Sequence, residues 1–357
     1  MASKVKQSAI VLSCLVVWLS SSAPAQAATA GEEIAVSGDT EFVHDPSIIR
    51  DGDTWYLFGT RNGPNREGEL PVRCSKDLHQ WKLCGHVLDQ IPDWIKNESP
   101  QTKELWAPDI SYFNGEYHLY YAFSVFGKNT SGIALLTNKK LDPHSPKFHW
   151  EDRGLVLGSR LQDDYNAIDP NLMLDGKGGA WLCFGSFWTG IKMRRIDPKT
   201  GKLASADTTI YSLARRQPPA NPSPNPPELP GDWQAIEAPF LVHHGDYFYL
   251  FVSFDLCCRG TRSNYKTVVG RARSATGPYA DASGIPMLEG GGTPVLLGNG
   301  RWIGPGGESV RQGKDQDIIV FHAYDAKTGH AYLQISTIDW TGGWPHVALE
   351  GGNPANK

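Results

Sequence analysis

The 357-residue chain lacks several features that would place it in other classes of protein. It has no long run of Lys and Arg and its net charge is −4, so a nucleic acid is not an expected partner. No stretch after residue 27 is long and apolar enough to span a membrane. The spacing C-x-x-C is absent, which argues against a structural zinc site. We therefore expect a soluble protein, with no membrane partner, that binds a neutral molecule.

Convincing helical periodicity is also missing. Short runs of Val, Ile, Tyr, Phe and Trp alternate with turns, in keeping with 38 Gly and 25 Pro in the chain. This pattern predicts an all-β protein. The proline-rich segment 217–230 is interpreted as a surface loop, not as a linker between domains.

The first 27 residues differ from the rest. Lys4 and Lys6 precede an apolar stretch at 9–19 that is too short to cross a membrane, and residues 25–27 read Ala-Gln-Ala, a small-x-small cleavage pattern. We predict a signal peptide over 1–27 and one catalytic domain over 28–357, in a secreted or periplasmic protein. A membrane anchor is the alternative interpretation of this leader.

Cysteines are few, and five of the six follow the leader. Cys74 and Cys84 flank a predicted hairpin, and export makes a bridge between them possible. The neighbours Cys257 and Cys258 could form a bridge with each other. Cys183 lies in an apolar strand and is expected to be a buried free thiol.

What the chain does contain is an internal repeat. Five times, an acidic residue beside a proline or a glycine pair precedes a polar turn and an aromatic-rich or apolar strand, and the turn glycines lie 61 to 69 residues apart. The five acidic residues are Asp45, Asp109, Asp169, Glu237 and Glu308. With about four strands per unit, the repeat predicts a five-bladed β-propeller whose first strands line a central channel. A β-sandwich or a β-helix fits this number and length less well.

The ends of such a ring must also meet. We expect residues 333–340, together with the residues before Asp45, to close the propeller.

Three of the acids, Asp45, Asp169 and Glu237, share a matched setting before a proline. Each alone would be read as a turn cap or as the partner of an arginine. On strands that surround one axis they would meet, and like charges held together raise one another's pKa. Such clusters are typical of acid–base catalysis. Glycoside hydrolysis needs one carboxyl group to protonate the leaving oxygen and a second to activate water.

At these residues the chain resembles glycoside hydrolase family 43, and most closely its arabinanases, which cut α-1,5-linked arabinofuranose chains. The resemblance spans nearly the whole chain after the leader. It rests on six blocks, at residues 44–46 (HDP), 106–109 (WAPD), 167–171 (AIDPN), 185–191 (GSFWTGI), 236–239 (IEAP) and 257–260 (CCRG).

The resemblance implies a five-bladed propeller that hydrolyses arabinan or arabino-oligosaccharides with inversion. It assigns Asp45 as the general base, Glu237 as the general acid, and Asp169 as the residue that tunes the pKa of the acid and orients it. Inversion would place base and acid roughly 6.5–9.5 Å apart, which leaves room for water.

Substrate contacts and an ion also follow from the resemblance. It points to Trp106, Asn166, Ser186 and Phe187 at the substrate, although Trp106 could instead cap the core between two blades. His322 is expected to hold a central calcium ion whose other ligands are mostly water. A packed histidine is the alternative, because calcium prefers oxygen ligands.

The chain departs from the family pattern in the fifth repeat. Many relatives carry a Gly-His pair where this chain reads Gly306-Gly307, so a second central histidine is missing. Glu308 is either a fourth channel carboxylate or points into its blade. Asp109, which follows its proline, is interpreted as structural.

Other activities fit the same scaffold. An exo-acting α-L-arabinofuranosidase, a β-xylosidase and a non-catalytic propeller that binds polysaccharide all remain open. Segments 90–103 and 217–230 are long enough to close the ends of a cleft, which would favour exo action. We expect a monomer.

Overall fold

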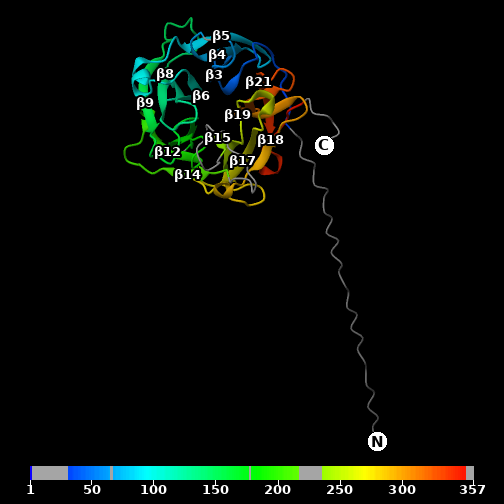
Figure 1. Ribbon diagram of the computed structural model, residues 1–357. Helices are drawn as coiled ribbons and strands as arrows, with labels where there is room; N and C mark the ends of the chain where they lie inside the picture. Colours follow the sequence, from blue (N-terminus) through cyan, green and yellow to red (C-terminus); the bar gives the residue numbers. More distant parts are fainter. Residues whose placement is uncertain (2–30, 65–66, 177, 217–234, 351–357) are drawn as a thin grey trace.

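The computed structural model describes residues 1, 31–64, 67–176, 178–216 and 235–350 (Figure 1). Apart from Met1, the predicted signal peptide lies outside the described residues, and so does the segment 217–230. In the part that is described, no helix has the length and apolar character needed to cross a membrane.

Five sheets, each a meander of antiparallel strands, surround one axis (Figure 1). Blade 1 contains β2 (His44–Asp51), β3 (Thr54–Thr60), β4 (Glu69–Ser75) and β5 (Gln80–Leu88), with β1 (Ser37–Gly38) parallel to β5. Blade 2 contains β6 (Leu105–Phe113), β7 (Glu116–Phe123), β8 (Ser131–Asn138) and β9 (Glu151–Ser159). Blade 3 contains β10 (Asn171–Leu174), β11 (Ala180–Phe184), β12 (Ile191–Asp197), β13 (Lys202–Leu203) and β14 (Tyr211–Ala214).

Blade 4 contains β15 (Ile236–His244), β16 (Tyr247–Phe254), β17 (Lys266–Ala272) and β18 (Thr293–Leu296). Blade 5 contains β19 (Trp302–Arg311), β20 (Ile318–Asp325), β21 (Ala331–Asp339) and β22 (His346–Val347). The prediction of a five-bladed β-propeller is therefore confirmed. The innermost strands are β2, β6, β10, β15 and β19. The strands β2 and β15 begin one residue before the acid of their motif and β10 begins directly after its motif, as the repeat predicted, whereas β6 and β19 begin three residues before their prolines.

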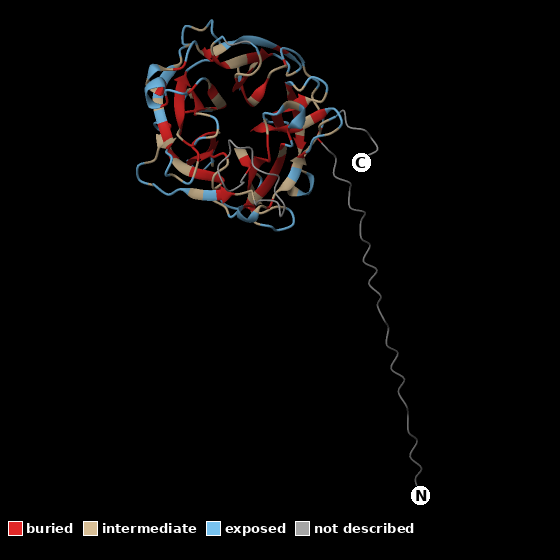
Figure 2. Cartoon of the chain, viewed as in Figure 1, coloured by how far each residue is buried: buried red, intermediate tan, exposed pale blue. Residues whose placement is uncertain are grey.

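The aromatic-rich strands are buried on both faces, because each blade is covered by two neighbours. In β16, Phe248 and Leu250 enter the core shared with blade 3, whereas Tyr249 and Phe251 enter the core shared with blade 5. Successive side chains of a strand point to opposite faces, so a strand in this position needs a continuous apolar run. Figure 2 shows buried residues along the strands and exposed residues mainly on the outer rim and its loops.

The ring closes where the predicted segments meet. The backbone N–H of Ile34 donates to the carbonyl of Ile335 at 2.8 Å, and that of Leu333 donates to Thr40 at 2.9 Å. Because β1 pairs with β5 of blade 1, residues 31–41 connect the last blade to the first.

The remaining expectations on local structure also hold. The only α-helix among the described residues is α1 (Asp93–Glu98), which places Ile95 in the core between blades 1 and 2. The 3₁₀ turns are η1 (Gly260–Arg262), η2 (Met287–Glu289) and η3 (Thr341–Gly343). Disulfides join Cys74 to Cys84 and Cys257 to Cys258, and Cys183 is buried and free.

Candidate active site

One backbone device is repeated at the channel end of all five innermost strands. A residue with positive φ stands there in each blade, followed by proline in four of them. These residues are Asp45 (46°), Ala107 (44°), Asp169 (54°), Ala238 (49°) and Gly307 (60°). The register also shifts at this point in blades 1, 2, 4 and 5. Positive φ is uncommon for residues other than glycine, and bulges re-aim side chains, so the device directs side chains at the channel mouth.

The five acids of the repeat do not occupy equivalent places in this device. Asp45 and Asp169 hold the positive-φ position itself, whereas Glu237 stands one residue before it. Glu308 stands one residue after this position and Asp109 two residues after it. The repeat in the sequence aligns these five acids, whereas the backbone places them at different positions relative to the residue with positive φ. Sequence spacing alone does not show which residue adopts positive φ.

Asp45, Asp169 and Glu237 nevertheless line one cleft of about 680 Å³. The residues predicted at the substrate line the same cleft, and so do two arginines: Trp106, Asn166, Ser186, Phe187, Arg61 and Arg259. His322 has no exposed surface and lies beneath Asp45, with its Nδ1 atom 3.9 Å from Asp45 Oδ1.

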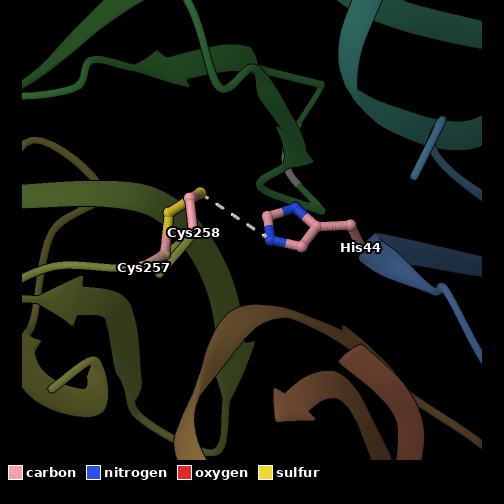
Figure 3. Close-up of side chains that lie close together, drawn as sticks. All are labelled: His44, Cys257 and Cys258. Carbon is pink, nitrogen blue, oxygen red and sulfur yellow. Dashed lines mark hydrogen bonds between the residues drawn. A yellow bond between two sulfur atoms is a disulfide. The ribbon is translucent and has the colours of Figure 1, made fainter. Parts of the chain in front are cut away.

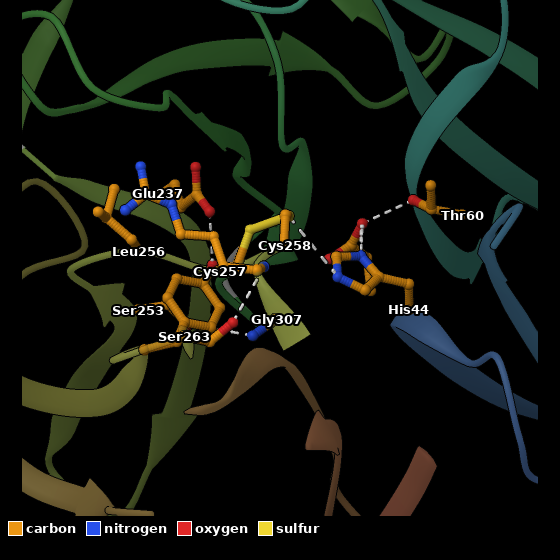
Figure 4. The surroundings of a disulfide bond; sticks show 12 residues. His44, Thr60, Glu237, Ser253, Leu256, Cys257, Cys258, Ser263 and Gly307 are labelled. Atoms are coloured by element: carbon orange, nitrogen blue, oxygen red, sulfur yellow. Dashed lines mark hydrogen bonds and ion pairs between the residues drawn. A yellow bond between two sulfur atoms is a disulfide. The ribbon is translucent and has the colours of Figure 1, made fainter. Parts of the chain in front are cut away.

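Asp45 is surrounded by groups that favour its ionised form. Thr60 Oγ1 donates to Asp45 Oδ2 at 2.6 Å, and His44 Nδ1 lies 3.1 Å from the same oxygen (Figure 4). Burial alone would raise the pKa of Asp45. The charge and hydrogen bond of His44 and the Thr60 hydroxyl outweigh it and hold the pKa well below its usual range. Asp45 is therefore a carboxylate at neutral pH.

The two histidines beside Asp45 differ in charge. Burial would lower the pKa of His44, but Asp45 and Tyr324 raise it well above its usual value. Its Nε2 atom lies 2.8 Å from the Tyr324 hydroxyl. Burial and the charge of His44 lower the pKa of His322, whose ring stacks on that of His44 with centroids 3.8 Å apart. One cation and one neutral imidazole thus back the carboxylate.

Among the described residues, no cationic side chain like that of His44 is in contact with Glu237 or Asp169. Ser186 Oγ donates to Glu237 Oε2 at 2.8 Å, Tyr265 donates to Glu237 Oε1 at 2.9 Å, and the N–H of Ala238 donates to Asp169 Oδ2 at 3.1 Å. Burial raises the pKa of Asp169, and the charges of Glu237 and Asp45 raise it further. Burial also raises the pKa of Glu237, partly offset by the two hydroxyl groups. This side of the cleft retains a proton more readily.

The other predicted cleft residues are held by contacts of several kinds. Ser131 Oγ donates to Asn166 Oδ1 at 2.7 Å, and Asn166 is buried. Phe187 has a φ of 59°, and its N–H donates to the carbonyl of Ile236 at 2.9 Å. Positive φ at a bulky residue is strained, so the fold holds this ring in place at the cleft wall.

Asp109 and Glu308 lie lower in the channel, at a small cavity of about 40 Å³. Asp109 accepts the N–H of Leu172 at 2.7 Å and so connects blade 2 to blade 3, in agreement with a structural role. Glu308 accepts hydroxyl protons from Ser253 at 2.8 Å and Thr267 at 2.9 Å. Burial raises the pKa of each carboxyl to about 7. Glu308 thus borders the channel and also bonds to blade 4.

The Cys257–Cys258 disulfide borders the cleft next to the histidine pair. Cys258 Sγ lies 3.8 Å from His44 Nε2 (Figure 3). The Cys258 N–H donates to the Tyr324 hydroxyl at 2.9 Å. Because both sulfurs are bonded to each other, they offer no thiolate to a metal ion.

Sequence reasoning missed several partners of the carboxylates. Thr60 ends the strand that follows the first motif, whereas Tyr265 lies outside every quoted block. Neither residue type signals a site. The pairing of strands within one blade brings Thr60, at the end of β3, to Asp45 on β2, and the loop before β17 brings Tyr265 to Glu237 on β15.

The fit to calcium depends on His322. A set of donor atoms from His44, Asp45 and His322 lies within 4.8 Å of one another, but it contains two imidazoles and one carboxylate. Calcium takes six to eight oxygen ligands, so water would have to supply most of them. His322 Nε2 is buried without a protein hydrogen-bond partner, which leaves this atom available to a ligand or to water.

Comparisons with known proteins agree with this geometry. The family model described as Glycosyl hydrolases family 43 matches residues 40–345. An extracellular endo-α-(1→5)-L-arabinanase of Bacillus subtilis is 42% identical over 327 residues, which cover 91% of this chain and 92% of that protein. An extracellular exo-α-(1→5)-L-arabinofuranosidase of Cellvibrio japonicus is 42% identical over 313 residues, covering 85% and 86%.

A solved structure supports the same conclusion. The Cellvibrio cellulosa α-L-arabinanase complexed with arabinohexaose superposes with a TM-score of 0.79 at 39% identity, covering 87% of this chain and 96% of that one. Both the sequence and the fold therefore match over most of their length. The chain belongs to glycosyl hydrolase family 43.

Proposed function

We propose that this protein hydrolyses the α-1,5-L-arabinofuranosidic bonds of arabinan by an inverting acid–base mechanism. The observation that carries the proposal is the contrast within one cleft between Asp45, whose pKa is lowered, and Glu237, whose pKa is raised. Pairs of carboxyl groups whose environments push their pKa values apart are typical of an acid and a base. The relatives named endo- and exo-arabinanases support the choice of substrate.

In this mechanism Asp45 takes a proton from a water molecule as its oxygen attacks the anomeric carbon. Glu237 gives its proton to the glycosidic oxygen as the bond to the leaving sugar breaks. The turnover leaves Asp45 protonated and Glu237 ionised, and exchange with solvent restores both. Asp169 is assigned to tuning and orienting the acid. The two carboxyl groups are close enough for the charge of Glu237 to raise the pKa of Asp169, and Asp169 accepts the N–H of Ala238 in the turn that carries Glu237.

Substrate contacts are assigned to the cleft wall. Trp106 and Phe187 offer aromatic rings on which the apolar face of a sugar can stack, and Asn166 and Ser186 offer polar groups. Ser186 also donates to Glu237, so it connects substrate binding to the acid.

We propose that calcium, if bound, is held by His322 with water as its other ligands. An ion there supplies positive charge near Asp45 and favours its ionised form. The expected outcome of chelator treatment is a loss of activity that added calcium restores, with a lower thermal midpoint in the stripped protein. An unchanged midpoint and rate after exhaustive chelation would remove the ion from the proposal.

Endo or exo action is the next distinction. The endo and exo relatives are both 42% identical to this chain, so identity does not separate the two. Segment 217–230 lies outside the described residues, and segment 90–103 is anchored by buried Ile95. A product profile over time on linear arabinan, with aryl arabinofuranoside and xyloside in parallel, distinguishes long products from single sugars and arabinose from xylose. We also propose that the protein is secreted and acts as a monomer.

The proposed function is tested with debranched arabinan. Wild type should release reducing sugar, with the anomeric configuration inverted by NMR, and Glu237→Gln should release almost none while still binding the polymer. If wild type binds arabinan but cuts neither it nor any arabinoside or xyloside, the chain is a binding propeller and the proposal is wrong.

A further inference from the structure

Glu308 occupies the one innermost-strand position at which the other four blades have proline. It follows Gly307, just as Pro46, Pro108, Pro170 and Pro239 follow the positive-φ residues of their blades. All five side chains border the same small channel cavity. Four of these side chains carry no polar group, so among the five equivalent positions only that of blade 5 holds an ionisable group.

The Glu308 carboxyl bonds to the neighbouring blade. It is 4% exposed, and its Oε2 atom accepts both hydroxyl protons, from Ser253 on β16 and from Thr267 on β17. Its Oε1 atom is buried at the cavity without a protein hydrogen-bond partner. Glu308 therefore fixes where the Ser253 hydroxyl points its single proton.

From Ser253 a chain of polar contacts leads to the acid. Ser253 Oγ accepts the N–H of Gly307 at 3.0 Å (Figure 4). The Ser253 hydroxyl can give its one proton either to Glu308 or to the Tyr265 oxygen, and Tyr265 donates its own proton to Glu237 at 2.9 Å. Gly306 makes this approach possible. A Cβ atom there would lie 2.4 Å from the Tyr265 ring and 2.7 Å from Ser253 Oγ.

We propose that Glu308 is a positioning residue for Glu237, the general acid of the proposed function, and acts on it through Ser253 and Tyr265. While Ser253 donates its proton to Glu308, the Tyr265 oxygen receives little from Ser253, and Tyr265 is a weaker donor to Glu237. The acid then keeps its proton more readily, since a hydrogen bond to the ionised form lowers a carboxyl pKa. The inference rests on the proposed function, because it takes Glu237 as the general acid. A titration of Glu237 tests it without any hydrolysis of arabinan.

Glu308→Gln should reverse this arrangement. The amide can donate to Ser253, which then turns its proton to Tyr265 and makes Tyr265 a stronger donor to Glu237. The negative charge that Glu308 carries above about pH 7 is also lost. Both changes lower the pKa of Glu237, by about half a pH unit or more.

The surrounding titratable groups stay in place in this variant. Asp45, His44, Asp169 and Tyr265 act on Glu237, and Asp45 also acts on Glu308. Any change in the Glu237 titration therefore comes from the Glu308 end of the chain.

The first measurement does not need activity. The Glu237 carboxyl is titrated by ¹³C NMR in full-length wild type, Glu308→Gln, Tyr265→Phe and the double variant. We expect a lower pKa in Glu308→Gln and a higher one in Tyr265→Phe. Adding Glu308→Gln to Tyr265→Phe should then have a clearly smaller effect, because Phe cannot pass on the change.

The second measurement is the pH profile of kcat/KM on arabino-oligosaccharides, whose basic limb reports the acid. In Glu308→Gln this limb should move to lower pH. The loss at pH 8 should be large for arabinotriose and small for a nitrophenyl arabino-oligosaccharide, whose leaving group needs no proton. A merely structural defect would slow both substrates alike.

Asp109→Asn is the matched control. Asp109 is also a buried carboxyl at the cavity with a pKa near 7, but its bonds run to Leu172 and Asn171. It should leave the Glu237 titration unchanged. If Glu308→Gln proves unstable by thermal melting, Glu308→Ala, which also frees the Ser253 proton for Tyr265, replaces it.

A Glu237 pKa that stays put in Glu308→Gln, or that moves equally in Asp109→Asn, overturns the inference. So does a full effect of Glu308→Gln in the Tyr265→Phe background. These outcomes hold whether or not arabinan is cut. Failure of wild type to cut any arabinan would sink the proposed function by itself.

Discussion

Asp45 and Glu237 stand at the mouth of one channel, on near-identical backbone turns, yet their neighbours differ in kind. Asp45 meets an imidazolium, a second imidazole and a hydroxyl, whereas Glu237 meets two hydroxyls and shares its surroundings with Asp169. Both side chains are largely removed from water, which on its own raises the pKa of each. The neighbours alone decide that one pKa is lowered and the other raised.

This contrast shows that the backbone of the propeller fixes where the two carboxyl groups lie, whereas the side chains around each carboxyl group set its pKa. The same positive-φ turn occurs at Ala107 and Ala238, which carry no acid at that position. Such turns cost on the order of 1–3 kcal/mol each at residues other than glycine, so all five blades keep them for geometry and not for the acid itself.

The largest expected effect comes from removing each carboxylate in turn. On arabinan, Asp45→Asn and Glu237→Gln should each lower kcat by about 10³-fold, because a base or an acid is lost. The two should differ with a nitrophenyl substrate, which restores Glu237→Gln but not Asp45→Asn. Steady-state rates on both substrates, with melting curves to show that the fold is intact, provide the check.

Equal rescue of both variants would contradict the assignment of acid and base. Near-normal activity of Asp45→Asn on arabinan would remove Asp45 from the mechanism altogether.

A smaller effect is expected from His44→Gln. The charge and hydrogen bond of His44 lower the pKa of Asp45, so their loss should raise that pKa. The acidic limb of kcat/KM should then move to higher pH, by about one unit, whereas the basic limb should move much less, because the charge of His44 is only the smallest of the effects on Glu237. Thr60→Val, which removes only a neutral donor at 2.6 Å from Asp45, should move the same limb less.

If the basic limb moves as far as the acidic limb in His44→Gln, the pKa values of Asp45 and Glu237 are not set independently by the two sides of the cleft. The pH profiles of both variants on the same arabino-oligosaccharide settle the point.

The sequence predicted the parts of this molecule that repeat. Aromatic runs such as 247–251 indicated the strands of a propeller, and the acids at 45, 169 and 237 indicated one shared cleft. Both follow from local chemistry: a run of apolar side chains needs cover, and equivalent strands of a ring share an axis.

What sequence reasoning could not reach depends on how strands and blades pack. Ser253 meets Glu308 because blades 4 and 5 pack closely at Gly306, and Tyr265 meets Glu237 because the loop before β17 folds back over β15 within blade 4. The unequal places of Asp109 and Glu308 depend on where φ turns positive, and no residue type announces that for Asp45 or Ala107. Hydroxyl groups that reach a carboxylate from another strand lie at no regular distance from it along the sequence, so no motif reveals them.

The smallest effect on catalysis is expected from Asp109→Asn. This variant tests the contrast between a raised and a lowered carboxyl pKa through the pH dependence of the free energy of unfolding. Burial raises the Asp109 pKa to about 7, so the folded protein binds a proton that the unfolded chain, with a pKa near 3.9, has released. Between about pH 4 and pH 7 the folded state binds more protons, and this group therefore lowers the free energy of unfolding as pH rises. Asp45, with its lowered pKa, contributes the opposite slope and loses its stabilisation only as pH falls toward its folded pKa.

Asp109→Asn removes the contribution of Asp109 to the pH dependence of the free energy of unfolding, and it keeps an oxygen for the Leu172 N–H. Relative to wild type, the variant should gain stability from pH 5 to pH 8, by on the order of 1 kcal/mol for each unit of pKa shift removed. Urea unfolding at the two pH values measures the difference. The same gap between variant and wild type at both values would mean that Asp109 is ionised throughout, and that the channel below the catalytic residues is wetter than its burial indicates.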